Sequence, residues 1–145
     1  MLWVTRCHAH IDRVACPWLI TRFVDQKAKF IFAPWLAVSM MAAEGAIPFC
    51  IPNVELGHFK GRCSFESILL KYKLNDPALK RLARIVHAAD ISEDIDQDPI
   101  ARGLTAIATG FHLRYPADEE NMGVQFEVYD SLYAWCRLDV AKQQD

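Results

Sequence analysis

The residues best suited to chemistry begin in the N-terminal stretch RCHAHIDRVACPWLITRF, at positions 6–23. Arginine forks bind carboxylates and small oxyanions through paired N–H donors, and Arg6 and Arg13 supply two of them here. Pro17 is tolerated in the first turn of a helix and favours an extended residue before it, so we expect a helix from Pro17 to about Asp25. The preceding HIDRVAC would then be a loop at a helix N-terminus, which is a favourable place for an anion. We predict an oxyanion-binding pocket there, in which Asp12 orients a guanidinium group; an ordinary salt bridge of Asp12 with Arg13 is the alternative.

A fourth residue of this predicted pocket comes from the end of the chain. Asp130 and Arg137 lie two turns apart on one side of the last expected helix, so both can face inward toward the N-terminal loop. We expect Arg137 to close the oxyanion pocket, and an exposed, solvated pair is the competing interpretation.

A second kind of chemistry is indicated by the segment NVELGHFKGRCSFES, at 53–67, which carries His58, Cys63 and Glu66 between glycines. Imidazole, thiolate and carboxylate are the ligand types that zinc prefers, although this spacing matches no established zinc signature. Asp90 continues the apolar stripe of the helix before it, and a carboxylate on a buried face needs a partner. We therefore predict His58, Glu66 and Asp90 as ligands of a divalent metal ion, with Asp90 as a cap of the next turn as the alternative.

These side chains have to be positioned by an α+β fold. We expect a small three-stranded sheet from the N-terminal half packed against a mostly helical C-terminal half. The Asp-Pro pair at 76–77 is an N-cap followed by a first helical residue, and a Ser at 64 can cap the helix before it. With no linker or repeat, a single domain over 1–145 is the simplest account. The expected strands are 2–6, 28–34 and 46–52, and the expected helices are 17–25, 35–45, 64–74, 76–89, 99–113 and 119–138.

Composition and charge narrow the functional classes. A net charge of -2 gives the chain as a whole no general attraction to nucleic acid phosphates, although a local basic patch stays open. The apolar start is too short for a signal peptide or a membrane span, so we expect a cytoplasmic protein. Five cysteines without a CxxC pair indicate reduced thiols instead of a disulfide framework. Whether the chain forms a homo-oligomer stays open.

Two further hypotheses use other residues. The helices around 65–89 have the general plan of a helix-turn-helix with lysines and arginines on their polar faces, which is the DNA-binding alternative. Few Asn, Gln or Ser are available there to contact base edges, so nucleic acid is not the expected partner of this domain alone. Reduction of an oxidant by the thiols is the weaker alternative, since no two cysteines are close in sequence and no flavin or nicotinamide motif is present.

Several motifs resemble those of one family in the same order along the chain. They are WVTR with DRVACPWLITRFVD, GAIPFCIPNVELGH, CSFESILLKY, IVHAAD, GLTAIATG and VYDSLYAWCR, all within 3–137. Together they are similar to the C-terminal domain of the ChrB-type chromate resistance family. That family pattern has Asp where this chain has Cys50 and Arg where it has His87. If that aspartate belongs to a site, the site is altered here; the alternative is that the position is only structural.

The resemblance implies a role in bacterial chromate resistance, as a chromate sensor or an accessory protein, and implies no defined reaction. The function that we predict is binding or sensing of chromate or a related oxyanion. A metal-dependent enzyme of hydrolytic or redox type, using the predicted His/Glu/Asp ligands, is the first alternative.

Overall fold

The computed structural model describes residues 1–144. Its N-terminal half contains a parallel three-stranded sheet in the order β2-β1-β3, made by β1 (Leu2–Arg6), β2 (Lys29–Ala33) and β3 (Ile47–Pro48). Helices α1 (Ile11–Phe23) and α2 (Trp35–Ala43) connect these strands. The predicted α+β class and the β-α-β-α-β order are therefore confirmed, although β3 is much shorter than expected.

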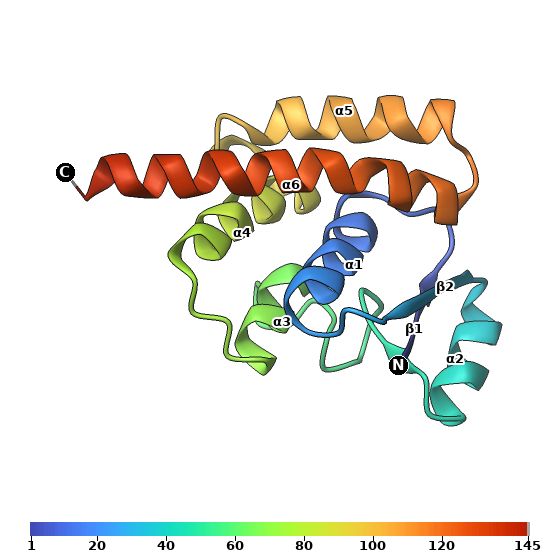
Figure 1. Ribbon diagram of the computed structural model, residues 1–145. Helices are drawn as coiled ribbons and strands as arrows, with labels where there is room; N and C mark the ends of the chain where they lie inside the picture. Colours follow the sequence, from blue (N-terminus) through green and yellow to red (C-terminus); the bar gives the residue numbers. More distant parts are fainter. Residues whose placement is uncertain (145) are drawn as a thin grey trace.

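After β3 and the irregular segment 49–63, the elements of the described chain are helices (Figure 1). The long α6 runs antiparallel to α5 along one side of the molecule, and it packs on α4 and α1. Asp76 accepts a hydrogen bond from Ala78 N at 2.8 Å, and a proline follows it at the first helical position, so the predicted cap of α4 is confirmed. These elements are α3 (Ser64–Lys71), α4 (Pro77–Asp90), the 3-10 helix η1 (Ser92–Gln97), α5 (Ala101–Arg114) and α6 (Asp118–Gln143).

The start of α1 differs from the prediction in a way that matters for the site. The helix begins at Ile11, so most of the segment HIDRVAC, which was expected to be a loop, forms its first turns. Pro17 lies inside the helix. Pro17 has no N–H to donate to the Arg13 carbonyl one turn earlier, but the helix is held by burial of its apolar residues. Ile11, Val14, Ala15, Trp18 and Leu19 follow the i, i+3, i+4, i+7, i+8 spacing of one helix face and are all buried.

The sheet separates two apolar clusters. Trp3 of β1 and Phe49 face the larger cluster, which includes the buried face of α1 and residues of α3, α4 and α6. Val4, one position further along β1, points to the other side, where it packs with Val38 of α2. The central strand is thus covered on both faces.

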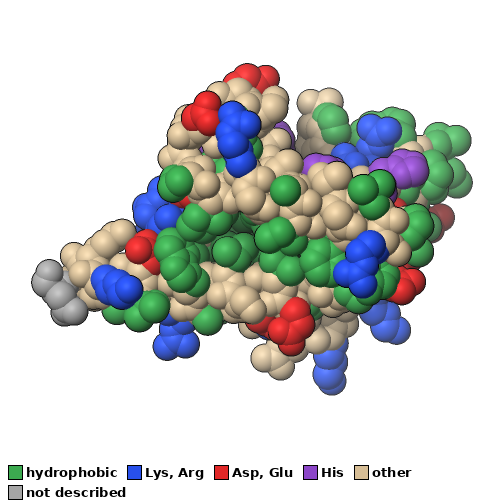
Figure 2. All heavy atoms as spheres, turned by 90° about the horizontal axis from the view of Figure 1, so that it is seen from above, with side chains coloured by type: hydrophobic (Ala, Val, Ile, Leu, Met, Phe, Trp, Pro, Cys, Tyr) green, Lys and Arg blue, Asp and Glu red, His purple; other side chains and the backbone are tan. Residues whose placement is uncertain are grey.

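The face formed by α5 and α6 carries apolar side chains in the open. Figure 2 shows hydrophobic side chains gathered in a band on this side of the molecule. The exposed large apolar residues of the two helices are Ile107, Leu113, Trp135 and Leu138. Exposed apolar patches of this kind are common at contacts with other protein chains. Whether the protein forms a homo-oligomer stays open, and this surface is the place to test it. None of the helices within 1–144 is long and apolar enough to cross a membrane.

Candidate functional site

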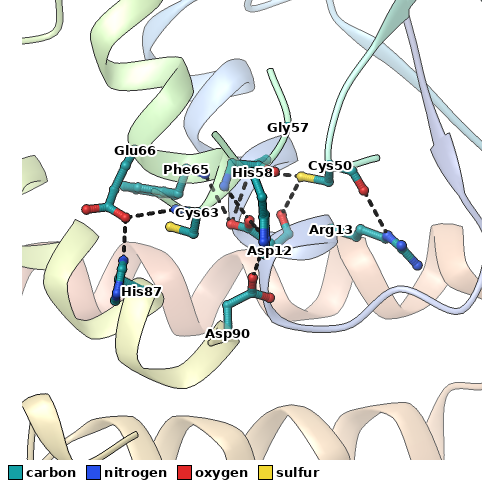
Figure 3. Close-up of polar contacts among 12 residues, drawn as sticks. Asp12, Arg13, Cys50, Gly57, His58, Cys63, Phe65, Glu66, His87 and Asp90 are labelled. Carbon is teal, nitrogen blue, oxygen red and sulfur yellow. Dashed lines mark hydrogen bonds and ion pairs between the residues drawn. The ribbon is translucent and has the colours of Figure 1, made fainter. Parts of the chain in front are cut away.

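Asp12 is the centre of the candidate site, because its position in the first turn of α1 aims its carboxylate at the N-terminus of α3 (Figure 3). One oxygen accepts the N–H of Ser64 at 2.7 Å and the other accepts the N–H of Phe65 at 3.2 Å. Only 4% of Asp12 is exposed. A carboxylate at a helix N-terminus is stabilised by the free N–H groups and by the helix dipole. Asp12 therefore caps α3 across the fold, and among the described contacts it does not orient Arg6 or Arg13.

His58 lies between two carboxylates. Its Nε2 is 2.9 Å from Oδ2 of Asp90 and 3.5 Å from Oδ2 of Asp12. Hydrogen bonding to Asp12 and the charges of both aspartates raise the pKa of His58 to about 9, against the lowering effect of burial. The imidazole is therefore protonated at neutral pH, while 55% of its side chain stays exposed.

Asp90 is the last residue of α4, and 15% of its side chain is exposed. Its carboxylate bonds His58, and burial together with the nearby Asp12 raises its pKa. In each of the three residues Asp12, His58 and Asp90, one ligand atom lies within 4.8 Å of the others, which is a spacing that a metal ion could bridge.

Arg13 follows Asp12 and points to the opposite side of the cluster, over the segment after β3. Its Nε donates to the Cys50 carbonyl at 3.4 Å and its Nη1 to the Cys7 carbonyl at 3.3 Å. Within residues 1–144 its Nη2 has no hydrogen-bond partner, so this end of the fork can still bind a ligand.

Two cavities that share lining residues lie beside this guanidinium, and we call them together the Arg13 cavity. Both are lined by Arg13, Cys50 and His58. The first has a volume of about 360 Å³ and is completed by the segment 51–53. The second, about 320 Å³, is completed by His10, Asp12 and Asp90. Burial, with the nearby His112 and Arg13, lowers the pKa of His10, so His10 enters this space as a neutral imidazole.

The other residues predicted for the oxyanion pocket lie elsewhere. Arg6 is exposed at the end of β1, with no hydrogen-bond partner among the described residues. Asp118, at the start of α6, accepts the backbone N–H groups of His8 and Ala9 just before α1. Arg137 comes 19 residues after Asp118 on the same helix, about 28 Å along its axis. The structure therefore does not bring Arg137 to Arg13.

Glu66 is also separated from the ligands with which the sequence grouped it. Its carboxylate accepts the N–H of Cys63 at 2.9 Å, which closes a capping box on α3, and it bonds Nδ1 of His87 at 2.6 Å. The other ring nitrogen of His87 is 2.6 Å from Asp94. Cys63, Glu66 and His87 form a second group of ligand atoms, which a metal ion could also bridge.

The sequence interpretation missed the pairing of Cys16 with Cys50, whose sulfur atoms lie 3.3 Å apart beside Asp12. Cys50 stands where the family pattern has an aspartate, and that departure was the available signal that the position faces a site. Cys16 could have been located by the helical spacing of its apolar neighbours, which continues on the N-terminal side of Pro17.

The basic residues of the predicted helix-turn-helix are partly engaged within the protein. Arg81 is 8% exposed and pairs with Asp98 at 2.7 Å and with Asp139 at 3.0 Å. Lys71 pairs with Glu55 at the surface. A groove of about 430 Å³ between α3 and α4 has Lys80 and Arg84 on its lining, so two of these basic groups remain available there, next to Arg62 from the preceding segment.

The fold and the site together define a helix-rich α+β domain with a small cavity, lined by Arg13 and His58, at the start of its first helix. Residues 3–136 match the family model "ChrB, C-terminal domain", and the chain belongs to this chromate-resistance-associated family. It is 35% identical over 134 residues to Protein ChrB of Cupriavidus metallidurans, an alignment that covers 90% of this chain and 39% of that protein. The chain thus spans well under half the length of this relative. No solved structure gives a significant match.

Proposed function

We propose that the protein binds chromate or a related small oxyanion in the Arg13 cavity, as part of a chromate-resistance response. One observation carries the proposal: a guanidinium with an unpartnered nitrogen and a protonated imidazole line the same cavity. Tetrahedral oxyanions are bound in proteins by such charge-assisted donors. Arg6, on the same end of the sheet, stays a predicted contributor, whereas Arg137 is not among the residues that line the cavity.

The two aspartates of the site offset part of this positive charge, since they also keep His58 protonated. Asp12 directs both oxygens toward backbone N–H groups of α3, which hold its negative charge at the helix end. Asp90 has a raised pKa, so part of the population is neutral near pH 7. Arg13 lies on the side of His58 away from α3, where a dianion gains from both cations.

Calorimetric titration with chromate and with sulfate tests the proposal. Arg13→Ala should abolish measurable chromate binding, because it removes the guanidinium that lines both parts of the cavity. Arg102→Ala is a matched control, since Arg102 is an exposed arginine paired only with Asp96 in the described chain. Unchanged affinity in Arg13→Ala, or an equal loss in Arg102→Ala, would rule out the Arg13 cavity.

A divalent metal site at Asp12, His58 and Asp90 is the second candidate, favoured by the convergence of their ligand atoms. The metal would replace the proton of His58 and could support hydrolytic or redox chemistry. Elemental analysis of the purified protein, before and after addition of zinc or manganese, tests this candidate. A stoichiometric ion that is lost in Asp90→Asn would support it, whereas protein that neither holds nor gains an ion would remove it.

A further inference from the structure

We propose that Cys16 and Cys50 form a redox-active dithiol that reduces a small two-electron oxidant entering the Arg13 cavity and closes to a disulfide. The two residues are 34 positions apart in sequence, yet their sulfur atoms are separated by 3.3 Å. A disulfide bond measures about 2.05 Å, so the sulfurs need to approach each other by a little over 1 Å. Side-chain rotation can supply a movement of this size.

The surroundings hold the pair in place. The Cys50 thiol contacts the Asp12 carbonyl at 3.5 Å, and the Cys16 thiol contacts the Asp12 carboxylate at 3.4 Å. The Cys50 backbone is fixed as well, because its N–H donates to the Leu56 carbonyl and its carbonyl accepts from Arg13. Cys50 has φ of 53°, a left-handed conformation that is uncommon for a residue with a side chain. Such positions are maintained where the surrounding structure determines the backbone.

The two sulfurs differ in access, and this difference assigns their roles. Cys50 is 8% exposed and lines both parts of the Arg13 cavity, whereas Cys16 is completely buried. An oxidant in the cavity therefore meets Cys50 first, and Cys16 is the resolving thiol behind it. Burial raises the pKa of both thiols, so the resting pair is a protonated dithiol and its oxidation is expected to be slow.

The chemistry balances without any further co-reactant. With hydrogen peroxide, the Cys50 sulfur takes one oxygen as a sulfenic acid and releases water; Cys16 then displaces the hydroxyl, forming the S–S bond and a second water. With chromate, two thiols and HCrO4⁻ give a disulfide, water and HCrO3⁻, in which chromium has accepted two electrons. The chromate reaction rests on the proposed oxyanion binding, whereas the peroxide reaction does not.

Peptide mapping of the folded protein tests the pair directly. Trypsin cleaves after Arg13, Arg22, Lys29 and Lys60, which places Cys16 in peptide 14–22 and Cys50 in peptide 30–60. After treatment with hydrogen peroxide and blocking of free thiols, these peptides should be found cross-linked, and dithiothreitol should separate them. Cys63→Ser should keep the cross-link, which makes it the matched control for a neighbouring buried thiol.

Variants of the pair give the remaining outcomes. Cys50→Ser should abolish the cross-link, and Cys16→Ser should leave Cys50 as a sulfenic acid that dimedone traps. Absence of the cross-link in the folded wild-type protein, a cross-link to Cys63 instead, or an equal yield in urea-unfolded protein would overturn the proposal.

A chromate arm separates this inference from the proposed function. Arg13→Ala also removes the hydrogen bond to the Cys50 carbonyl, so each oxidant is compared with its own wild-type rate. The variant should slow cross-linking by chromate at least tenfold more than it slows cross-linking by peroxide, because peroxide carries no charge for Arg13 to bind. If peroxide forms the cross-link and chromate does not, the dithiol stands and chromate as its oxidant fails. If Arg13→Ala slows cross-linking by both oxidants by the same factor, the dithiol stands and anion binding by Arg13 fails.

Discussion

Two histidines in this protein are each placed between two carboxylates, and they differ in what surrounds them. His58 joins Asp12 and Asp90 with 55% of its side chain exposed, at the edge of a cavity. His87 joins Glu66 and Asp94 with 14% of its side chain exposed, between α3, α4 and η1. We call the group of Asp12, His58 and Asp90, around the exposed histidine, the open cluster, and the group of Glu66, His87 and Asp94, around the less exposed histidine, the closed cluster.

The comparison separates an interaction that holds elements together from one that can meet a ligand. The partners of His87 use both of its ring nitrogens, so the imidazolium has no donor left for anything else. His58 uses only Nε2 toward the aspartates, and the rest of its ring faces the Arg13 cavity. Free donors and access distinguish the two clusters more clearly than their charges do.

The largest expected effect comes from Asp12, which gives the open cluster a structural role as well. Asp12→Ala leaves the buried N–H groups of Ser64 and Phe65 without an acceptor, and it should lower the free energy of unfolding by about 2–4 kcal/mol. Urea denaturation followed by circular dichroism measures this loss. Asp12→Asn keeps one oxygen acceptor and should lose about half as much; a loss under ~0.5 kcal/mol in Asp12→Ala would show that this cap contributes little.

The next largest effect is expected at His87, and it tests the role of the closed cluster. His87→Ala removes the shared partner of Glu66 and Asp94, and we expect a loss of about 1–3 kcal/mol in unfolding free energy with oxyanion affinity unchanged. Denaturation and calorimetry on the same variant provide the two readouts. Loss of oxyanion binding without loss of stability would reverse the assignment of the two clusters.

His58 should show the opposite behaviour. Because its side chain is mostly exposed, His58→Gln should change the unfolding free energy by less than about 1 kcal/mol. Affinity for chromate or sulfate should fall at least tenfold, since a cation next to the bound anion is lost. Equal affinity of this variant and the wild type in calorimetry would mean that the imidazolium does not contact the anion.

The smallest effect is a dependence on pH. The pKa of His58 is raised from 6.5 to about 9, so the charged form and its contribution to stability are fully present below pH 6.5 and are lost as the pH rises through about 9. Sulfate keeps a constant charge over this range, and its affinity should fall severalfold between pH 8 and 10. His58→Gln should show no such decline, and a similar decline in both proteins would assign the titration to another group.

Sequence patterns predicted the parts of the fold that local rules determine. The Asp76–Pro77 cap and the order of strands and helices in the first half follow from short-range preferences, and both are confirmed. The predicted start of α1 at Pro17 is wrong, because the apolar spacing from Ile11 to Leu19 continues the helix on the N-terminal side of the proline. A buried stripe outweighs one missing hydrogen bond, since each apolar side chain contributes about 1.5–3 kcal/mol when it is buried.

Which site residues lie next to one another was harder to predict from the sequence than the elements that carry them. Asp12, His58 and Asp90 come from α1, from the segment before α3 and from the end of α4, and no spacing rule connects positions so far apart. Residue types indicated that Arg13, His58 and Asp90 would do chemistry. The partners of Asp12 and Glu66 depend on how α3 meets α1 and α4, which only the tertiary structure specifies.

The hydrogen bonds from Ser64 and Phe65 to Asp12 join residues 52 and 53 positions apart, so the floor of the cavity exists only when the first helix and α3 have docked. A ligand of this cavity consequently binds the native state alone, and at about 100 times its Kd it adds about 2.7 kcal/mol to the free energy of unfolding. In a cell, where proteases remove unfolded chains, the same linkage would make the amount of this protein rise with the concentration of its ligand. A rise in melting temperature with added oxyanion is therefore a direct and label-free way to rank candidate ligands.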